Sequence, residues 1–182
     1  MEQRTRPTAP PGTPTEWGEP RSRTVTWYDP MTTAAAATTM SGLEFLRAMA
    51  EGSLPPAPIA TLIQMRPVEV DEGRVVFECE PDQSAYNPIG VVHGGLVCTL
   101  ADTVAACAVH TTLERGMGYT SIDINVSYLR PVTGESGVLR ATGQVTKRGR
   151  RVAFATAEIV DGAGRPVATA SGSCLVMDPR TA

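Results

Sequence analysis

The chain of 182 residues is poor in aromatic side chains, histidine and basic charge. Aromatics make up 5% of it, and a formal net charge of −3 gives no broad basic face, so nucleic-acid binding is not expected. The four cysteines lack both the paired spacing of metal ligands and the density of a disulfide scaffold. The two histidines have no Cys or carboxylate partners at ligand spacing, so no metal site is expected. No secretory signal is visible, and we expect a cytoplasmic protein with reduced thiols.

One stretch, Ile89 to Val109, is almost continuously apolar and about long enough to span a bilayer. Asp102 lies well inside it, and a central Asp costs roughly 2.5–3.5 kcal/mol on insertion scales. Much of the remainder is Gly, Ala, Cys and Thr, which offset little of that cost. The stretch therefore predicts a buried helix and no membrane span.

The chain divides by composition near residue 38. Residues 1–38 carry prolines among Thr, Gly and Arg, which predicts an extension that is largely disordered or draped on the body. Thr24 to Tyr28, with Trp27, is the exception and could form a short strand or an aromatic anchor. Residues 39–179 have enough apolar content for one domain. The prolines of the extension are Pro7, Pro10, Pro11, Pro14 and Pro20.

The first part of the body predicts a helix and a hairpin. Ser41 is a favourable N-cap for a helix over residues 42–50, and Gly52 is its stop signal. Three prolines within residues 55–58 predict a stiff, extended turn. Strand-like runs follow over 63–70 and 74–80, joined by the turn signal Asp71-Glu72-Gly73.

Four more alternating runs follow the apolar helix, with meander-like spacing. They cover residues 121–128, 137–146, 151–160 and 166–176. In the first, Ile122, Ile124, Val126 and Tyr128 are expected on one face. The simplest arrangement is an α+β fold in which an antiparallel sheet of about six strands wraps one long central helix.

The run from Asn87 to Gly95 leads into that helix and carries the first chemical signal. Two glycines at a helix start leave the first-turn N–H groups free and let a ligand approach the backbone. Those N–H groups, at the positive end of the helix dipole, can stabilise a developing oxyanion. The alternative is that the glycines only permit a tight turn.

Asp102 carries the second signal. It shares one helical stripe with Gly95, Thr99, Thr103 and Ala106, whereas the other faces are Leu, Val, Ala or Cys. A carboxylate on an apolar helix must be paired or solvated in a cavity, which makes Asp102 a functional-site candidate. The alternative is a buried structural Asp that caps a neighbouring loop.

Helix geometry separates these two signals. Gly94 and Asp102 are eight residues apart, about 12 Å along a helix axis, so one chain cannot easily bring both to one carbonyl. If they act together, Asp102 of one copy must meet the 87–94 loop of a second copy across a two-fold axis.

The motif Asn87-x-x-Gly90-x-x-His93-Gly94-Gly95, followed by Leu100-Ala101-Asp102, resembles the signature of the hotdog-fold thioesterases of the phenylacetate-degradation (PaaI-like) family. The resemblance covers residues 41–178, including the segment 121–125 and Arg130-Pro131. It implies hydrolysis of an acyl- or aryl-acyl-coenzyme A thioester at a dimer interface, with coenzyme A as part of the substrate and no separate cofactor.

The resemblance also implies residue roles. Asp102 would be the nucleophile or the general base that activates water, and the Gly94 amide would polarise the thioester carbonyl. Asn87 would position the water or carbonyl, and His93 would hold the loop. A hydroxyl from the following strand, Ser121 or Thr120, would assist. The remaining substrate-binding candidates are Gly95 and Thr103 on the helix.

The remaining candidates are a basic turn, the second histidine and two cysteines of the helix. The turn Lys147-Arg148-Gly149-Arg150-Arg151 could bind coenzyme A phosphates or be a solvated hairpin tip. His110 is expected to act as a C-terminal helix-dipole partner, and Cys98 and Cys107 are expected in the core.

The leading hypothesis is a homodimeric or tetrameric acyl-CoA thioesterase. The rival from another class is a non-catalytic acyl-CoA sensor, which would not need a carboxylate at position 102. A hotdog hydratase or dehydratase would be expected to show a different Asp/His arrangement. The acyl preference is not determined by the sequence.

Overall fold

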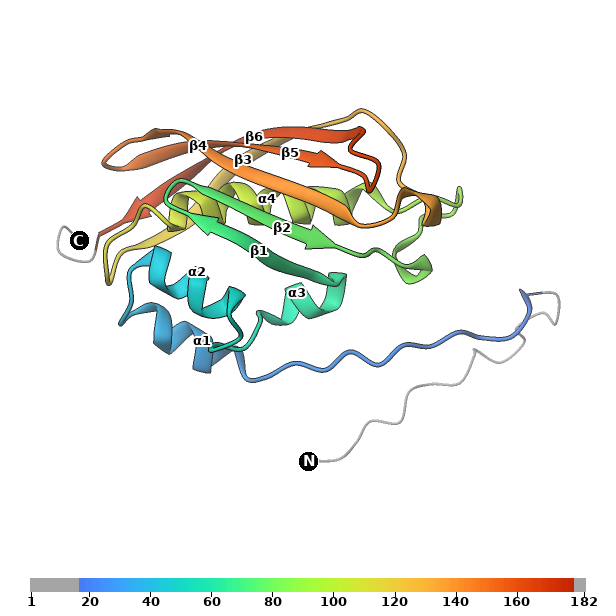
Figure 1. Cartoon of the computed structure of the whole chain (residues 1–182), viewed down its shortest axis with the longest axis horizontal. Coiled ribbons are helices and arrows are strands. Elements are labelled where there is room, and N and C mark those ends of the chain that lie inside the picture. Colours follow the sequence, from blue (N-terminus) through green and yellow to red (C-terminus); the bar gives the residue numbers. More distant parts are fainter. Residues whose placement is uncertain (1–16, 179–182) are drawn as a thin grey trace.

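The computed structural model describes residues 17–178, where an antiparallel sheet surrounds a long helix (Figure 1). The strand order is β1-β2-β4-β5-β6-β3. The strands are β1 (Met65–Asp71), β2 (Arg74–Cys79), β3 (Gly118–Tyr128), β4 (Leu139–Arg148), β5 (Val152–Val160) and β6 (Pro166–Met177). The helices are α1 (Pro30–Ala37), α2 (Gly42–Ala50), α3 (Pro58–Ile63) and α4 (Gly94–His110), with 3₁₀ turns η2 (Gln83–Ala85) and η3 (Gly134–Ser136).

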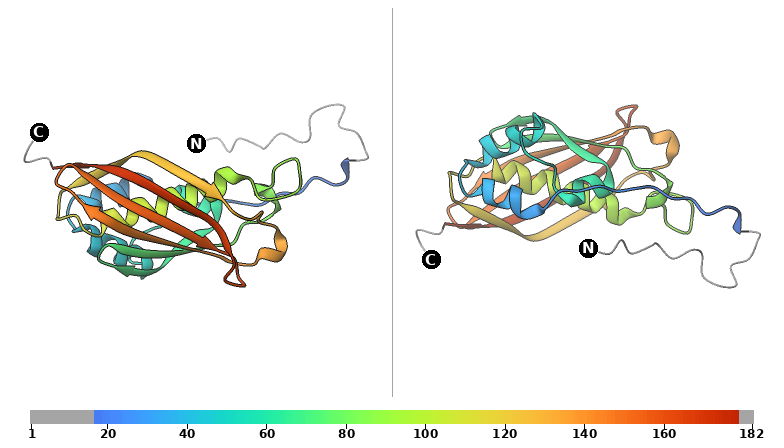
Figure 2. Two further views of the ribbon diagram at one scale, coloured as in Figure 1. Left: turned by 90° about the horizontal axis from the view of Figure 1, so that it is seen from above. Right: turned by 90° about the horizontal axis from the view of Figure 1, so that it is seen from below.

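Helix α4 is the centre of the fold and contacts every strand from β2 to β6. Strand β1 is covered by α2 and α3 instead, and α1 packs on α2, so the three short helices form a layer below the sheet (Figures 1 and 2). The predicted hotdog fold, with about six strands around one buried helix, is confirmed. Within residues 17–178, every helix is too short or too polar to cross a membrane.

The contact between α4 and the sheet is made by very small residues. A Cβ atom on Gly143 of β4 would lie only 2.0 Å from the carbonyl oxygen of Val104, so the helix backbone rests directly on the strand. Around this point both layers are lined by fully or nearly fully buried alanines. These are Ala101, Ala105 and Ala108 on the helix and Ala141, Ala153, Ala155 and Ala157 on the strands. The close approach explains why the core needs few aromatic side chains.

The predicted caps and turns of the first half are largely confirmed. Ser41 and Glu44 form a reciprocal capping box, in which the Glu44 amide donates to Ser41 Oγ at 3.3 Å and the Ser41 amide donates to Glu44 Oε2 at 2.8 Å. Helix α2 has the predicted bounds. The hairpin β1–β2 also forms as predicted, with Asp71 opposite Arg74 and Gly73 at φ 75°.

The boundary before β1 was predicted incorrectly. The strand-like run was expected from Ile63, but Ile63 ends helix α3, and Gln64 then takes a left-handed conformation at φ 58°. Pro58 explains this helix, because its fixed φ suits the first turn and its missing N–H is not needed there. Strand β1 therefore begins at Met65.

The described part of the N-terminal extension contains a helix that composition did not predict. Asp29 caps α1 by accepting from the Met31 amide at 2.9 Å, and a run of alanines continues the helix. Residues 24–28 form no strand, and Trp27 is 60% exposed in the single chain, so it is not a buried anchor. The predictions for Pro7, Pro10, Pro11 and Pro14 lie outside the described residues.

Strand β3 differs from the prediction in both neighbour and face. It does not continue a meander into β4 but pairs with β6, which makes it an edge strand of the sheet. A β-bulge between Ser121 and Asp123 interrupts the alternation. Ile124 and Val126 pack on the core, whereas Ile122 and Tyr128 are 56% and 55% exposed. The bulge therefore turns Ile122 away from the face of Ile124 and Val126, whereas Tyr128, although exposed, stays on that face and packs on Gly94 of α4.

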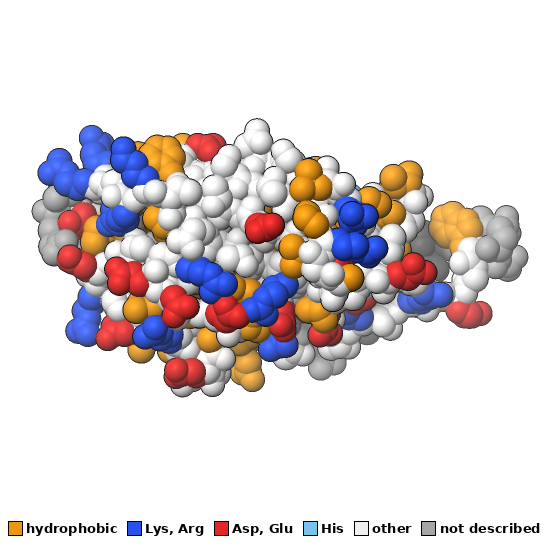
Figure 3. Space-filling model, turned by 45° about the horizontal axis from the view of Figure 1, so that its top comes forward, with side chains coloured by type: hydrophobic (Ala, Val, Ile, Leu, Met, Phe, Trp, Pro, Cys, Tyr) orange, Lys and Arg blue, Asp and Glu red, His pale blue; other side chains and the backbone are white. Residues whose placement is uncertain are grey.

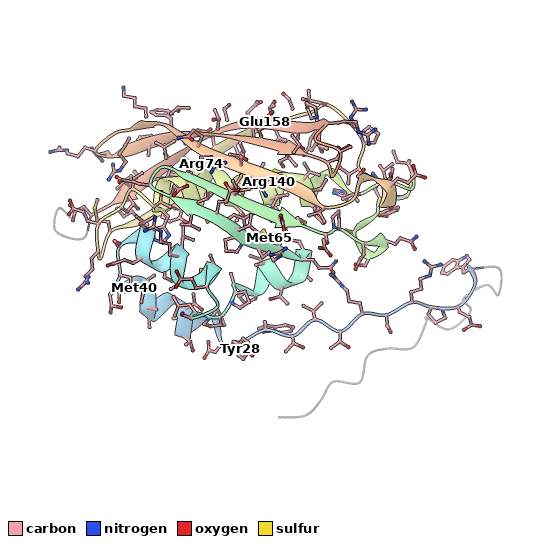
Figure 4. The ribbon with its side chains drawn as sticks, viewed as in Figure 1. Tyr28, Met40, Met65, Arg74, Arg140 and Glu158 are labelled. Atoms are coloured by element: carbon pink, nitrogen blue, oxygen red, sulfur yellow. The ribbon has the colours of Figure 1, made fainter. Side chains whose placement is uncertain are left out.

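The outer face of β1, β2 and β4 is polar. Glu69 of β1 accepts from Arg74 of β2 at 2.8 Å and also pairs with Arg140 of β4, the next strand but one, while Glu78 pairs with Arg66 at 2.5 Å. Figure 4 shows Arg74 and Arg140 close together on this face. The cross-strand ion pairs match the strand register and keep this side of the sheet solvated.

Candidate active site

The loop before α4 is held by its own backbone and by Asn87. Asn87 Oδ1 accepts from the amides of Ile89 and Val91 at 3.1 and 3.3 Å, and the Asn87 amide donates to the Val91 carbonyl at 2.8 Å. The His93 amide donates to Ala85 at 2.8 Å and closes the loop. The oxygen of Asn87 is thus used by the turn, and its Nδ2 group is the part that could address a substrate.

His93 caps helix α4. Its Nδ1 accepts from the Gly95 amide at 2.8 Å, so in the neutral ring the proton lies on Nε2. The residue is exposed, which leaves Nε2–H as a donor at the mouth of the site. A Cβ atom on Gly95 would lie 2.9 Å from Nδ1, so glycine at this position is required for the cap.

Gly94, at the first helical position, presents a free backbone donor. Among residues 17–178 its N–H has no hydrogen-bond acceptor, whereas its carbonyl accepts from Tyr128 Oη at 3.0 Å. A Cβ atom here would lie 3.2 Å from the Tyr128 ring, so the tyrosine packs directly on the glycine. Tyr128 therefore fixes the orientation of the peptide next to the free N–H.

Asp102 lies mid-way along α4 and is half-buried beside β3. Ser121 Oγ donates to its Oδ1 at 2.8 Å, so Ser121, rather than Thr120, contacts the carboxylate. The two line a recess of about 10 Å³ together with Asp123, whose carboxylate accepts from Ser173. A space of this size accommodates roughly one water molecule.

The groups behind Asp102 stay neutral. Burial raises the pKa of the Cys107 thiol to about 12, and burial likewise raises the pKa of the Tyr119 hydroxyl and of the Cys174 thiol. A protonated thiol is a poor nucleophile. The thiols of Cys107 and Cys174 are therefore not candidate nucleophiles.

A larger cavity, of about 270 Å³, begins at the first turns of α4. His93, Gly95 and Thr99 line it on the helix side, and no residue is shared with the recess at Asp102. One chain thus brings Asp102 to Ser121, and Gly95 to His93, but places the two pairs in separate spaces. The helix stripe predicted from the sequence runs between them.

Thr103 and Thr99 have hydroxyls that are already engaged. Each Oγ donates to the carbonyl four residues earlier in α4, Thr99 to Gly95 at 2.9 Å and Thr103 to Thr99 at 2.8 Å. Their oxygen lone pairs remain available as acceptors. Thr103 is half-buried. Its side chain therefore forms part of the helix surface, and its hydroxyl hydrogen is already used and not available to a substrate.

The predicted basic turn is the tip of the β4–β5 hairpin. Lys147, Arg148, Arg150 and Arg151 are all exposed, and none of them takes part in a salt bridge within the described residues. Figure 3 shows Lys and Arg side chains gathered at this end of the molecule. The tip lies near the C-terminal end of α4 and away from Gly94 (Figure 1).

His110 does not have the role expected for it. It is 8% exposed and packs between Phe45 and Tyr119, and burial lowers its pKa to about 4. It is therefore uncharged at neutral pH and cannot act as a cationic partner of the helix dipole. Cys98 and Cys107, expected in the core, are half-buried.

Three residues near these spaces were missed by sequence reasoning. Tyr128 braces Gly94, Asp123 shares the recess with Asp102, and Arg23 of the extension lines the larger cavity. Asp123 and Tyr128 belong to an alternating strand, and pattern alone could mark them only as strand positions. Nothing local to Arg23 points to a cavity formed by residues about 40 to 75 positions away.

Comparisons with known proteins show which family and fold the chain resembles. The family model of the thioesterase superfamily matches residues 89–168. Human acyl-coenzyme A thioesterase 13 is 35% identical over 95 residues, which are 52% of this chain and 66% of that protein. The match thus spans just under two thirds of this curated relative.

Solved structures show the same fold over most of the chain. The phenylacetic acid degradation-related protein of Ralstonia eutropha is 30% identical, with a TM-score of 0.66, covering 71% of this chain and 98% of that one. E. coli PaaI, from the phenylacetic acid degradation operon, is 24% identical with a TM-score of 0.66, covering 77% of this chain and 97% of that one. The latter likeness concerns the fold alone.

Proposed function

The chain belongs to the thioesterase superfamily, and we propose that it hydrolyses an acyl- or aryl-acyl-coenzyme A thioester to the free acid and coenzyme A. The observation that carries the proposal is Asp102, a carboxylate on an apolar helix that receives a hydrogen bond from Ser121 at 2.8 Å beside a water-sized recess. The name of the human relative supports coenzyme A as the carrier.

Asp102 acts on water or on the thioester itself. As a general base, its free Oδ2 takes a proton from water while the water oxygen attacks the thioester carbon, and the C–S bond then breaks to release the thiolate. As a nucleophile, the carboxylate attacks the same carbon and forms an anhydride that water hydrolyses. In both routes Ser121 holds Oδ1 and orients the carboxylate. Label found in Asp102 after single-turnover hydrolysis in H₂¹⁸O would identify the nucleophilic route, because it enters the residue only when water attacks the aspartyl carbon of the anhydride.

The Gly94 amide stabilises the oxyanion of either route. Its N–H has no acceptor within residues 17–178 and lies at the positive end of α4, where a developing negative charge is favoured. His93, whose Nδ1 accepts from the Gly95 amide, supplies a second donor through Nε2–H. Asn87 keeps the loop in the conformation that presents both groups.

The complete site requires two copies of the chain. Asp102 lines one space and Gly95 with His93 lines another, and eight residues of α4 separate Asp102 from Gly94. Strand β3 has an open edge, and Ile122 beside it is 56% exposed. At the tip of the 87–91 loop Ile89 is 83% exposed, which suits burial against a second copy. We assign the assembly as a homodimer or a dimer of dimers.

The hairpin tip fits the phosphates of coenzyme A. Arg148, Arg150 and Arg151 are exposed and take part in no salt bridge within residues 17–178, and guanidinium groups suit phosphate oxygens. Because the tip lies away from Gly94 in its own chain, it belongs to the copy that contributes Asp102. Gly95 and Thr103 then line the passage for the thioester end of the substrate.

Thiol release from a panel of acyl-CoAs tests the reaction. We expect turnover in the wild type and a loss of about 10²–10⁴-fold in Asp102→Asn, with acyl-CoA binding retained in calorimetry. Asp123→Asn is the matched control, because it removes a carboxylate of the same recess that Ser173 holds. Turnover by Asp102→Asn at the wild-type rate would refute the mechanism, and binding without turnover in the wild type would indicate a sensor.

Mixing two inactive variants tests the shared site. Asp102→Asn and Gly94→Pro each damage a different half, so a mixed dimer has one intact site and one doubly damaged site. After random exchange we expect about a quarter of the wild-type activity. No recovery, with mixed dimers confirmed by mass spectrometry, would place both halves in one chain.

A further inference from the structure

The N-terminal extension is fastened to the body by two arginines. Arg23 donates to the Leu62 carbonyl at 2.5 Å and pairs with Asp82 at 3.3 Å, and Arg21 donates to Gln83 Oε1. These partners lie at the end of α3 and in the loop before the active-site turn. Residues 17–29 therefore form a strap that runs along this side of the molecule (Figures 1 and 2).

Arg23 lines the 270 Å³ cavity that starts at the first turn of α4. The cavity is bounded by His93 and Gly95 at the helix and by Arg23 at the strap. The walls between them are mainly apolar and include Leu62, Ile63, Pro81, Ala85 and Leu96. The strap and the candidate active site are thus connected through one space, although the strap lies outside the segment that matches the family.

The charge of Arg23 is already compensated. Asp82 pairs with Arg23 and also accepts hydrogen bonds from Ser84 and Gln64. Because Ser84 and these other donors stabilise the anion, the pKa of Asp82 lies below its usual range. The side chain of Arg23 is 28% exposed. Arg23 therefore serves as a wall of the cavity and not as an open cation for an anionic ligand.

We propose that Arg23 determines acyl-chain specificity by closing the far end of an acyl-binding cavity. This inference rests on the proposed thioesterase function. A space of about 270 Å³ lies just below the roughly 300–1,000 Å³ of typical small-molecule sites. It therefore suits a medium-length acyl group such as octanoyl, or a compact arylacetyl group, better than a long chain. Longer chains meet Arg23.

Replacing Arg23 opens the cavity to longer chains. Each additional methylene that enters an apolar cavity tightens binding by about fourfold. We expect Arg23→Ala to lower KM for dodecanoyl-CoA by at least about tenfold relative to KM for octanoyl-CoA. Arg66→Ala is the matched control, because Arg66 is also a paired arginine, 67% exposed, on the outer face of β1.

The experiment compares butanoyl-, octanoyl- and dodecanoyl-CoA in three full-length proteins: wild type, Arg23→Ala and Arg66→Ala. Turnover gives kcat and KM, and calorimetry in an Asp102→Asn background gives Kd without hydrolysis. Support is a shift of both profiles to longer chains in Arg23→Ala alone. An unchanged profile in Arg23→Ala, or an equal shift in Arg66→Ala, overturns the inference.

The two proposals fail in different ways. If the wild type turns over no acyl-CoA but Arg23→Ala still shifts the chain-length dependence of Kd, the thioesterase function is wrong and the role of Arg23 stands. If turnover is present and Arg23 has no effect on either profile, the function stands and the cavity is not closed by the strap. If no acyl-CoA binds, both are refuted.

Discussion

His110 makes the stability of the protein depend on pH. The side chain is 8% exposed and packs against Phe45 and Tyr119, with ring centroids 5.3 and 4.9 Å away. Burial penalises the charged imidazolium and lowers the pKa from 6.5 to about 4. In the unfolded chain the ring titrates near its ordinary value. The folded state is thus the poorer proton acceptor.

The sign and size of the effect follow by linkage. Well above pH 6.5 His110 is neutral in both states, and no stability is lost. As the pH falls from 6.5 towards 4 only the unfolded state takes up the proton, so the free energy of unfolding decreases. Between pH 7 and pH 5 the loss from this one group is about 2 kcal/mol. Below pH 4 both states are protonated and the loss reaches its limit, at about 3 kcal/mol.

Urea unfolding followed by circular dichroism at pH 7, 6 and 5 measures this loss, at one fixed protein concentration because of the proposed self-association. His110→Leu removes the titrating ring and should flatten the pH dependence by about 2 kcal/mol relative to wild type. The chain has only one other histidine, so His93→Gln is the control that separates the effect of His110 from that of the second imidazole. Equal slopes in wild type and His110→Leu would refute the reasoning, as would an imidazole NMR titration midpoint near 6.5.

Three further changes test other parts of the structure. Gly94→Pro removes the N–H at a helix position that tolerates proline, and we expect kcat to fall about 10²–10³-fold. The control is Gly94→Ala, which keeps the N–H and places the same Cβ atom against Tyr128. Similar kcat values in the two variants would exclude the oxyanion role. Ser121→Ala should lower kcat about tenfold, and Ser127→Ala on the same strand should not, as thiol release will show. Gly143→Ala puts a methyl group 2.0 Å from the Val104 carbonyl oxygen and should destabilise the fold by about 3 kcal/mol or more. Thermal melts measure the effect, with Thr142→Ala as the control. An unchanged melting temperature in Gly143→Ala would contradict the contact.

Features encoded by neighbouring residues could be read from the sequence. The Ser41 cap, the Glu72-Gly73 turn and the glycine pair at the start of α4 each depend on residues within one turn of the chain. The unusual Asp102 stood out because a single carboxylate on an apolar helix is costly. These local signals were enough to identify the central helix, the strands and the most informative catalytic candidate.

Features that depend on pairing between distant residues could not be read. The place of β3 beside β6 is set by the closure of the sheet and not by the spacing of the strands. The bulge after Ser121 has no local sequence signal. The length of the loop before β3 is also not encoded locally, so the sequence favours Ser121 but leaves Thr120 as an alternative. The depressed pKa of His110 likewise depends on Phe45, which lies far away in the chain and near it in the fold.

The glycine and alanine contact between α4 and the sheet has a consequence for how such a protein diverges. The backbone of α4 rests directly on Gly143. No side chain of residues 17–178 lies between helix and strand at this point that could repack and let the helix slide or rotate. The positions of Gly94 and Asp102 relative to the sheet are then fixed by this contact, while the strap at residues 17–29 can be altered without disturbing them. A mutational library aimed at new acyl preferences should therefore randomise the strap and leave the helix as it is.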